Sequence, residues 1–315
     1  MRKTWIKTIL LAILGLGLAL LSNWAQAAIY DRSGNKIPDA DVNSSQVNWE
    51  LLSAEKSRKY NGIGLLEQES EGFCTAFFLN TGGDDNAPAY AVTNGHCADI
   101  HTEPAAKEIL INRPSNKVFK LNYFVNAKSS VRPVHVRQVV YATMKSTDIS
   151  ILELDTTFNQ LVKEGFTPWK IAEVPPSIGE PIEVIGIPMT GVKSSLSYLH
   201  RTNCQVGQVV NLREGVYHWE QAIRTRCSVV GGMSGSPVVS LRSNQVVAIA
   251  NTGVDDKALK QPECSKNRPC ELFNDGRVAT FPKENYAQRV YPIPSCFDKK
   301  GIFNLNLPSC GLEKP

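Results

Sequence analysis

The sequence lacks several patterns that are typical of common protein classes. It contains no Cys-x-x-Cys pair, and no cysteine and histidine are spaced as zinc ligands, which argues against a metal site. No long stretch has a sustained helical period, which argues against a doubly wound α/β fold. Internal repeats and low-complexity tracts are also missing. The overall composition is that of an ordinary globular protein that buries a core.

The one long uncharged run lies at the N-terminus. Residues 9–21 are uncharged and follow Arg2, Lys3 and Lys7, and a small-x-small site ends at Ala27. This pattern predicts a signal peptide of residues 1–27, cut after Ala27, and therefore a secreted or periplasmic protein. The alternative is a membrane anchor, but the run is shorter than the roughly 18 to 20 apolar residues that span a bilayer.

Net charge is low once this segment is removed. The whole chain of 315 residues has a formal charge of +4, and residues 1–27 hold three basic and no acidic residues, which leaves +1. A nearly neutral protein offers no electrostatic attraction to nucleic acid or to an anionic membrane. We expect neither as a partner, and the oligomeric state stays open.

Eight cysteines lie after the predicted leader, and an even number in an exported chain is typical of disulfides. Eight cysteines allow 105 pairings, so their number alone does not fix the connectivity. The cysteines are Cys74, Cys97, Cys204, Cys227, Cys264, Cys270, Cys296 and Cys310.

Short runs rich in β-branched and aromatic residues recur along the chain and predict strands. They lie at residues 73–79, 89–93, 134–141, 149–154, 182–187, 238–241 and 246–250. Such a series favours an all-β fold, either a barrel or a sandwich.

The chain divides into four parts. Residues 1–27 form the leader, and residues 28–60 are polar and form an N-terminal arm or a propeptide. Residues 61–295 form the main domain, and a proline-marked break near its middle predicts two lobes, residues 61–168 and 169–295. Residues 296–315 form a C-terminal tail. A possible helix at residues 285–290 ends before Pro292 and Pro294.

Five histidines limit the chemistry that the glycine-flanked Ser234 could perform. A serine hydroxyl needs a histidine base to become a nucleophile, and all five histidines precede Ser234. An α/β-hydrolase places its histidine after the serine, so that class is excluded. His96 follows an apolar strand, and Asp148 lies at the start of another, so rigid β structure could hold both side chains.

These three motifs resemble those of the chymotrypsin-like (trypsin-like) serine peptidases. The histidine motif is Thr93-Asn94-Gly95-His96-Cys97, and the aspartate motif is Thr147-Asp148-Ile149. The serine motif is Gly232-Met233-Ser234-Gly235-Ser236-Pro237, which has the form found in bacterial members. The resemblance covers roughly residues 62–290 and implies two six-stranded antiparallel β-barrels with the site between them.

The resemblance also implies roles. Ser234 attacks the scissile carbonyl, His96 acts as base and then acid, and Asp148 orients His96 from behind. The imidazole is expected within hydrogen-bonding range of the hydroxyl. The backbone amides of Gly232 and Ser234 form the oxyanion hole. No metal and no organic cofactor is needed.

Disulfides and the substrate pocket follow from the same resemblance. It pairs Cys74 with Cys97, and we expect Cys204–Cys227, Cys264–Cys270 and Cys296–Cys310 as the other disulfides. Motif offset places Ser228 at the base of the primary pocket, with Val229, Asn251 and Gly253 at its walls. Because the base carries no carboxylate, an uncharged substrate side chain is expected. The remaining histidines, with Asp99 and Asp155, are interpreted as surface residues.

One departure from the family concerns Met233. In animal relatives an aspartate at this position pairs with a freed N-terminal amine and orders the oxyanion loop. Met233 cannot accept that ion pair, so either it is buried beneath the loop or the loop is loose. The sequence therefore predicts a secreted or periplasmic serine endopeptidase that acts on proteins or peptides. The alternative is a catalytically silent relative that binds peptides or a partner, and an exported metal-binding protein is a third interpretation.

Overall fold

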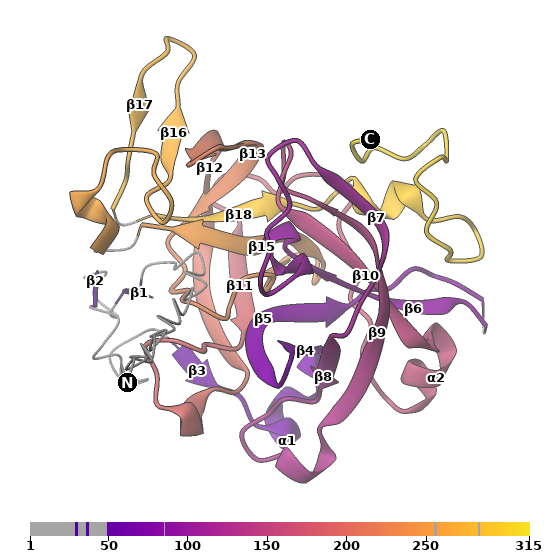
Figure 1. Cartoon of the computed structure of the whole chain (residues 1–315). Coiled ribbons are helices and arrows are strands. Elements are labelled where there is room, and N and C mark those ends of the chain that lie inside the picture. The colour runs from indigo at the N-terminus through magenta and orange to yellow at the C-terminus, as the bar shows by residue number, and fades with distance from the viewer. Residues whose placement is uncertain (1–28, 31–35, 38–48, 85, 255–256, 283) are drawn as a thin grey trace, which may run out of the picture.

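The computed structural model describes residues 29–30, 36–37, 49–84, 86–254, 257–282 and 284–315. The predicted leader lies outside the described residues. Two closed β-barrels lie side by side in the molecule (Figure 1). Both are antiparallel, as expected from the sequence, so the predicted double-barrel fold is confirmed. Within the described residues, no helix is long and apolar enough to cross a membrane.

The first barrel is built from a ring of six strands. Their order is β10-β6-β5-β4-β8-β9, and pairing of β9 with β10 closes the ring, while β7 extends the other edge of β9. The bounds are β4 Ile63–Gln68, β5 Glu71–Phe78, β6 Pro88–Thr93, β7 Ile109–Pro114, β8 Val118–Leu121, β9 Arg132–Thr143 and β10 Ile149–Thr157.

The second barrel repeats this plan. Its ring order is β11-β14-β15-β18-β13-β12, closed by pairing of β11 with β12. The bounds are β11 Pro181–Gly186, β12 His200–Glu214, β13 Tyr217–Thr225, β14 Pro237–Ser240, β15 Val246–Gly253 and β18 Asn285–Arg289. A β-hairpin of β16 (Cys270–Leu272) and β17 (Val278–Ala279) extends β12 away from the barrel (Figure 1).

The helix that the sequence suggested at residues 285–290 is wrong, because this segment is strand β18. It lies between β13 and β15, so it is covered on both edges. Asn285 and Gln288 are fully buried, and the Asn285 side-chain amide donates to the carbonyl of Cys227 at 2.8 Å. The sequence therefore lacks the apolar composition that normally marks a strand.

Residues 49–60, which precede the predicted main domain, are packed onto the barrels. Strand β3 (Trp49–Leu51) pairs with β12, and a short helix α1 (Ala54–Ser57) follows it. The Tyr60 ring is buried and stacks on Trp169 with ring centroids 5.9 Å apart. Two further short strands, β1 (Ile29–Tyr30) and β2 (Lys36–Ile37), pair with each other.

The core runs from one barrel into the other. One buried cluster joins Phe77 and Ile151 of the first barrel to Ile185 and Ile249 of the second, and it also contains Leu312 of the tail. Burial of this shared apolar surface fixes the two barrels against each other. Helix α2 (Phe158–Lys163) follows the first barrel, with the Thr157 hydroxyl as its N-cap.

Four disulfides reinforce this arrangement, and all four pairings expected from the sequence are confirmed. They are Cys74–Cys97, Cys204–Cys227, Cys264–Cys270 and Cys296–Cys310. Disulfides stabilise a fold chiefly by restricting the unfolded chain. The last of them closes a loop within the C-terminal tail, and burial of Cys296 and Leu312 in the shared core holds the tail against the barrels.

Candidate active site

His96 and Asp148 form a buried pair at one end of the first barrel. His96 lies in a 3-10 turn, Gly95–Ala98, directly after β6, and Asp148 directly precedes β10. The His96 Nδ1 atom lies 2.7 Å from Asp148 Oδ2, and the His96 backbone amide donates to Asp148 Oδ1 at 2.9 Å. Both carboxylate oxygens therefore hold the same residue, which fixes the imidazole in position and orientation.

The surroundings of His96 act on its pKa in opposite directions. Burial disfavours the charged form of His96, but the charge of Asp148 and its hydrogen bond outweigh burial and raise the pKa of His96. A neutral His96 that keeps its proton on Nδ1 leaves Nε2 free to accept one. The pair can therefore act as a base that becomes an imidazolium.

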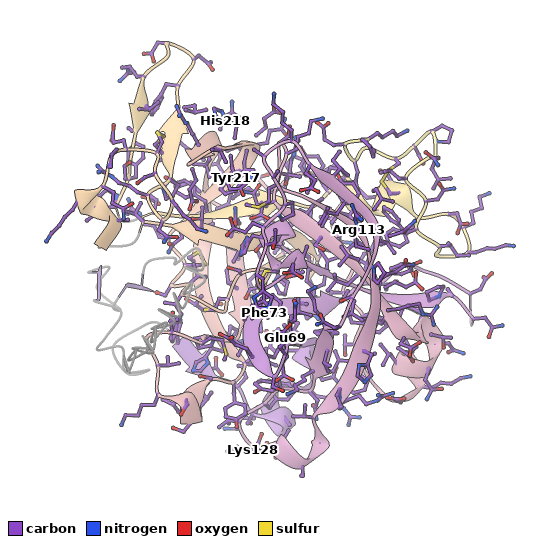
Figure 2. All side chains as sticks on the ribbon, in the orientation of Figure 1. Glu69, Phe73, Arg113, Lys128, Tyr217 and His218 are labelled. Carbon is purple, nitrogen blue, oxygen red and sulfur yellow. A yellow bond between two sulfur atoms is a disulfide. The ribbon has the colours of Figure 1, made fainter. Side chains whose placement is uncertain are left out.

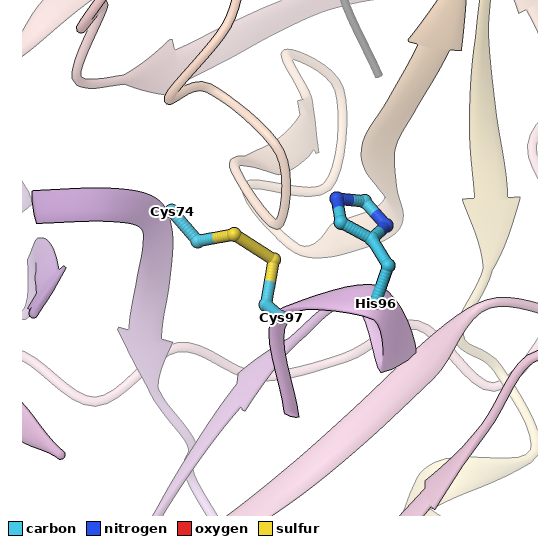
Figure 3. A group of neighbouring side chains, drawn as sticks. All are labelled: Cys74, His96 and Cys97. Carbon is cyan, nitrogen blue, oxygen red and sulfur yellow. A yellow bond between two sulfur atoms is a disulfide. The ribbon is translucent and has the colours of Figure 1, made fainter. Parts of the chain in front are cut away.

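Ser234 lies on the loop between β13 and β14 of the second barrel, and contacts with β5 hold this loop against the first barrel. The Thr75 amide donates to the Ser234 carbonyl at 2.8 Å, and the Thr75 hydroxyl donates to the Gly232 carbonyl at 2.9 Å. Thr75 follows Cys74, whose disulfide with Cys97 lies beside the His96 ring (Figure 3). The serine loop and the histidine turn therefore meet at the same end of the first barrel.

One of the two expected hydrogen bonds of the triad is present and one is absent. Asp148 binds His96, but the His96 Nε2 atom has no hydrogen-bond partner within the described part of the chain. The Ser234 hydroxyl therefore does not bind Nε2 in this structure. Catalytic hydrogen bonds are often long in ligand-free enzymes and shorten when substrate binds.

The glycines around Ser234 are required by geometry. Gly235 has φ +82°, and a Cβ atom there would lie 2.1 Å from Thr93 Oγ1 and 2.2 Å from the Thr75 carbonyl oxygen. Gly232 has φ +93° and would place a Cβ against Met189. Only glycine permits the positive φ and the close contacts at both positions, and at Gly235 these contacts are with the first barrel.

The backbone amides of Gly232 and Ser234 are not used to hold the loop. Among the described residues neither amide donates a hydrogen bond, whereas the carbonyl of Gly231 is occupied by the Met189 amide at 2.8 Å. Two unused amides two residues apart can bind an oxyanion.

Met233 is fully buried, which selects the first of the two alternatives left open by the sequence. Its side chain belongs to an apolar cluster with Trp49, Val229 and Val230. The Trp49 indole Nε1 donates to the Ser228 carbonyl at 2.7 Å. Burial and this hydrogen bond therefore order the loop in place of an ion pair.

The four residues expected at the primary substrate pocket separate into two places. Ser228 and Val229 lie in the loop before Ser234, next to Trp49 and Met233, and are almost fully buried. Asn251 instead lines a cavity of about 220 Å³ with His96 and Asp148. Gly253 ends β15 and is also buried.

Sequence reasoning missed the residues that complete this cavity. Glu214 and Tyr217 lie where β12 turns into β13, and Glu103 lies in the loop after the histidine turn. A glutamate before a glycine in a turn carries no sequence signal of a site. Only the fold brings the turn next to His96.

His200 is not a surface residue, contrary to the sequence interpretation. It begins β12, where it is fully buried, and its ring lies 5.4 Å from that of Trp49. Burial lowers the pKa of His200 to about 4, so the ring is neutral.

Three potential metal-ligand side chains lie close together, but two of them are joined in a disulfide. Cys74, His96 and Cys97 lie within 4.8 Å of one another. Because the two sulfurs are bonded to each other, they offer no thiolate. This group therefore fits a disulfide beside a histidine (Figure 3).

A family model for the trypsin-like peptidase domain matches residues 74–249, more than half of the chain. The chain belongs to the trypsin-like peptidases. This family contains serine proteases, and the match spans His96, Asp148 and Ser234. No curated protein matches the sequence.

Several solved structures are similar to this chain. The active form of a protease from M. tuberculosis is 13% identical, with a TM-score of 0.47, and the match covers 82% of this chain and 85% of that one. The human heparin binding protein is 14% identical, with a TM-score of 0.47 and coverage of 78% and 92%. A Glu endopeptidase is 17% identical, with a TM-score of 0.43 and coverage of 77% and 90%.

Proposed function

We propose that this trypsin-like peptidase is an exported serine endopeptidase that cleaves proteins or peptides through an acyl-enzyme. The buried His96–Asp148 pair is the observation that supports this most strongly, because both oxygens of one carboxylate hold one imidazole. Few structural roles require a histidine to be oriented in this way. Four disulfides agree with an oxidising compartment outside the cytoplasm.

The reaction would begin at Ser234. Its hydroxyl oxygen attacks the scissile carbonyl carbon while His96 Nε2 takes the hydroxyl proton, and Asp148 stabilises the imidazolium that forms. The carbonyl oxygen becomes an oxyanion, bound by the amides of Gly232 and Ser234. His96 then gives the proton to the leaving amine, and water, activated by the same imidazole, releases the acyl group.

A second candidate function is supported by one observation. His96 Nε2 lacks a partner among the described residues, so the nucleophile is not engaged in this ligand-free state. A protein that keeps this state when substrate is present would bind peptides without cleaving them. Cleavage therefore decides between the two functions.

The test is digestion of a peptide library, with products identified by mass spectrometry. Wild type is expected to cleave after uncharged residues, since Ser228 brings no carboxylate to the primary pocket. Ser234→Ala and His96→Ala should each lower kcat by about 10⁴-fold or more. Ser236→Ala is the matched control, because Ser236 is also buried in this loop but has no proposed role. A folded wild type that cleaves nothing, or a Ser234→Ala variant with full activity, would contradict the proposal.

A further inference from the structure

A pocket of about 220 Å³ lies beside the His96–Asp148 pair, on the side of the β12–β13 turn. We call it the side pocket and define it by Glu103, Met144, Glu214, Tyr217, Trp219 and Asn251. Figure 2 shows Tyr217 at this turn. Ser228 and Val229 do not line the side pocket, so it is separate from the base expected for the primary pocket.

One wall of the side pocket is apolar and flat. The rings of Tyr217 and Trp219 are stacked, with centroids 5.9 Å apart and an angle of 7° between their planes. Trp219 is held in place by a hydrogen bond from its Nε1 to the Met144 carbonyl at 3.1 Å. Such a wall suits the methylene chain of a long side chain.

The interior of the side pocket carries polar groups that are buried and lack partners. Glu214 is 4% exposed; its Oε1 accepts from the Asn267 amide at 2.8 Å, whereas its Oε2 has no partner in the described chain. Asn251 is 2% exposed, and neither its Oδ1 nor its Nδ2 has a partner there. Buried polar groups are normally satisfied, so two such side chains lining one pocket indicate a ligand that completes them.

The charges around the pocket select a cation. Glu103, Glu214 and Asp148 contribute three carboxyl groups, and one lysine, Lys266, reaches the rim. The Lys266 ammonium lies 2.9 Å from Glu103 Oε1, and the Tyr217 hydroxyl donates to Glu103 Oε2 at 3.3 Å. The rim carboxylate is thus already paired with a cation, while the buried Glu214 forms no ion pair with a lysine or arginine among the described residues. An acidic or apolar ligand would leave Glu214 without a partner.

We propose that the side pocket is a second specificity site, in which Glu214 and Asn251 bind the lysine or arginine side chain of a substrate residue near the one whose carbonyl Ser234 attacks. This inference rests on the proposed function, because a peptide bound at Ser234 would bring the side chain to the pocket. The methylene chain lies along Tyr217 and Trp219. The ammonium or guanidinium group donates to Glu214 Oε2 and Asn251 Oδ1.

The titration of Glu214 gives this proposal a pH signature. Burial raises the pKa of Glu214 to about 7, against the effects of the Asn267 amide, Thr252 and His96, and Glu103 raises it further. A cation binds the ionised carboxylate and not the neutral acid. Preference for a basic side chain should therefore increase about tenfold between pH 6 and pH 8.

The experiment compares matched peptides that carry lysine or its uncharged isostere norleucine at each of the three positions before the cleaved residue. Wild type should favour lysine at one position by about tenfold or more in kcat/KM at pH 8. Glu214→Gln should abolish this ratio. Glu153→Gln is the control, because Glu153 is similarly buried but lies on β10 with Arg137 and Gln138 as its partners. Lys266→Met removes the cation at the rim of the side pocket, so it should raise the ratio of kcat/KM for the lysine peptide to that for the norleucine peptide.

Three results would overturn the proposal: equal rates for lysine and norleucine at all three positions, a lysine preference that survives in folded Glu214→Gln, or a lower ratio in Lys266→Met. Binding of the same peptides to Ser234→Ala is measured in parallel by tryptophan fluorescence. If wild type cleaves no peptide, the proposed function fails, and the pocket is judged from these binding constants alone. Equal binding constants for the lysine and norleucine peptides would then reject the side pocket as a site for a basic side chain.

Discussion

Trp49 is the residue whose removal best tests how the serine loop is ordered. It lies on β3, ahead of the first barrel, yet its indole donates to Ser228, 179 positions later, and its ring packs in the cluster that contains Met233. Trp49→Phe keeps most of the packing and removes the hydrogen bond, which should cost about 1 kcal/mol. Trp49→Ala also removes the ring and should cost about 3 to 5 kcal/mol of stability.

The same change should be visible at Ser234. If the hydrogen bond contributes about 1 kcal/mol to holding the loop, Trp49→Phe should slow phosphonylation of Ser234 about fivefold, since 1.4 kcal/mol corresponds to tenfold. The assay pairs urea unfolding with the rate of fluorophosphonate labelling. Trp169→Phe is the control: Trp169 is equally buried, but its Nε1 has no partner among the described residues. Labelling at the wild-type rate in both folded Trp49→Phe and folded Trp49→Ala would show that Trp49 does not order the serine loop.

Three further predictions concern buried groups of the same site. Met233→Ala should lower the free energy of unfolding by about 2 to 5 kcal/mol, whereas Met233→Leu should lower it by less than about 1.5 kcal/mol. If urea unfolding shows small and equal decreases in stability for both variants, the Met233 side chain is not packed. Burial raises the pKa of Glu214 from 4.5 to about 7, so the folded state loses stability as pH rises through this window. Between pH 4 and pH 8, the free energy of unfolding of Glu214→Gln should therefore increase by up to about 3 kcal/mol relative to that of wild type. A difference in unfolding free energy between the two proteins that stays the same across these pH values would argue against a neutral buried acid. Because Asp148 raises the pKa of His96, kcat/KM should fall on the acid side with a midpoint above 6.5, and a midpoint below that value would argue against His96 as the base.

Most of the strands that the sequence revealed are buried along most of their length. Residues 246–250 form a continuous apolar run in β15, and residues 149–154, which are apolar except for Ser150 and Glu153, lie in β10. Strands β12 and β13 were missed because their outward faces are polar, so exposed and buried residues are interspersed along them. Strand β18 was missed for the opposite reason, since its buried side chains are themselves polar.

Only part of the candidate site could be predicted from the sequence. The chemistry of a reactive serine restricts which histidine and aspartate can serve it, so the order of His96, Asp148 and Ser234 along the chain was informative. Glu214 and Trp49 follow no such rule. Their neighbours lie far away in the sequence, and only the pairing of β12 with β13 and with β3 brings them to the site.

The reactivity of Ser234 is measured by the mass of the intact protein after reaction with a fluorophosphonate, followed by peptide mapping. We expect one adduct, on Ser234, that forms in wild type and in Ser236→Ala, and only very slowly in His96→Ala. A folded wild-type protein that gains no adduct, or one modified at another residue, would contradict it.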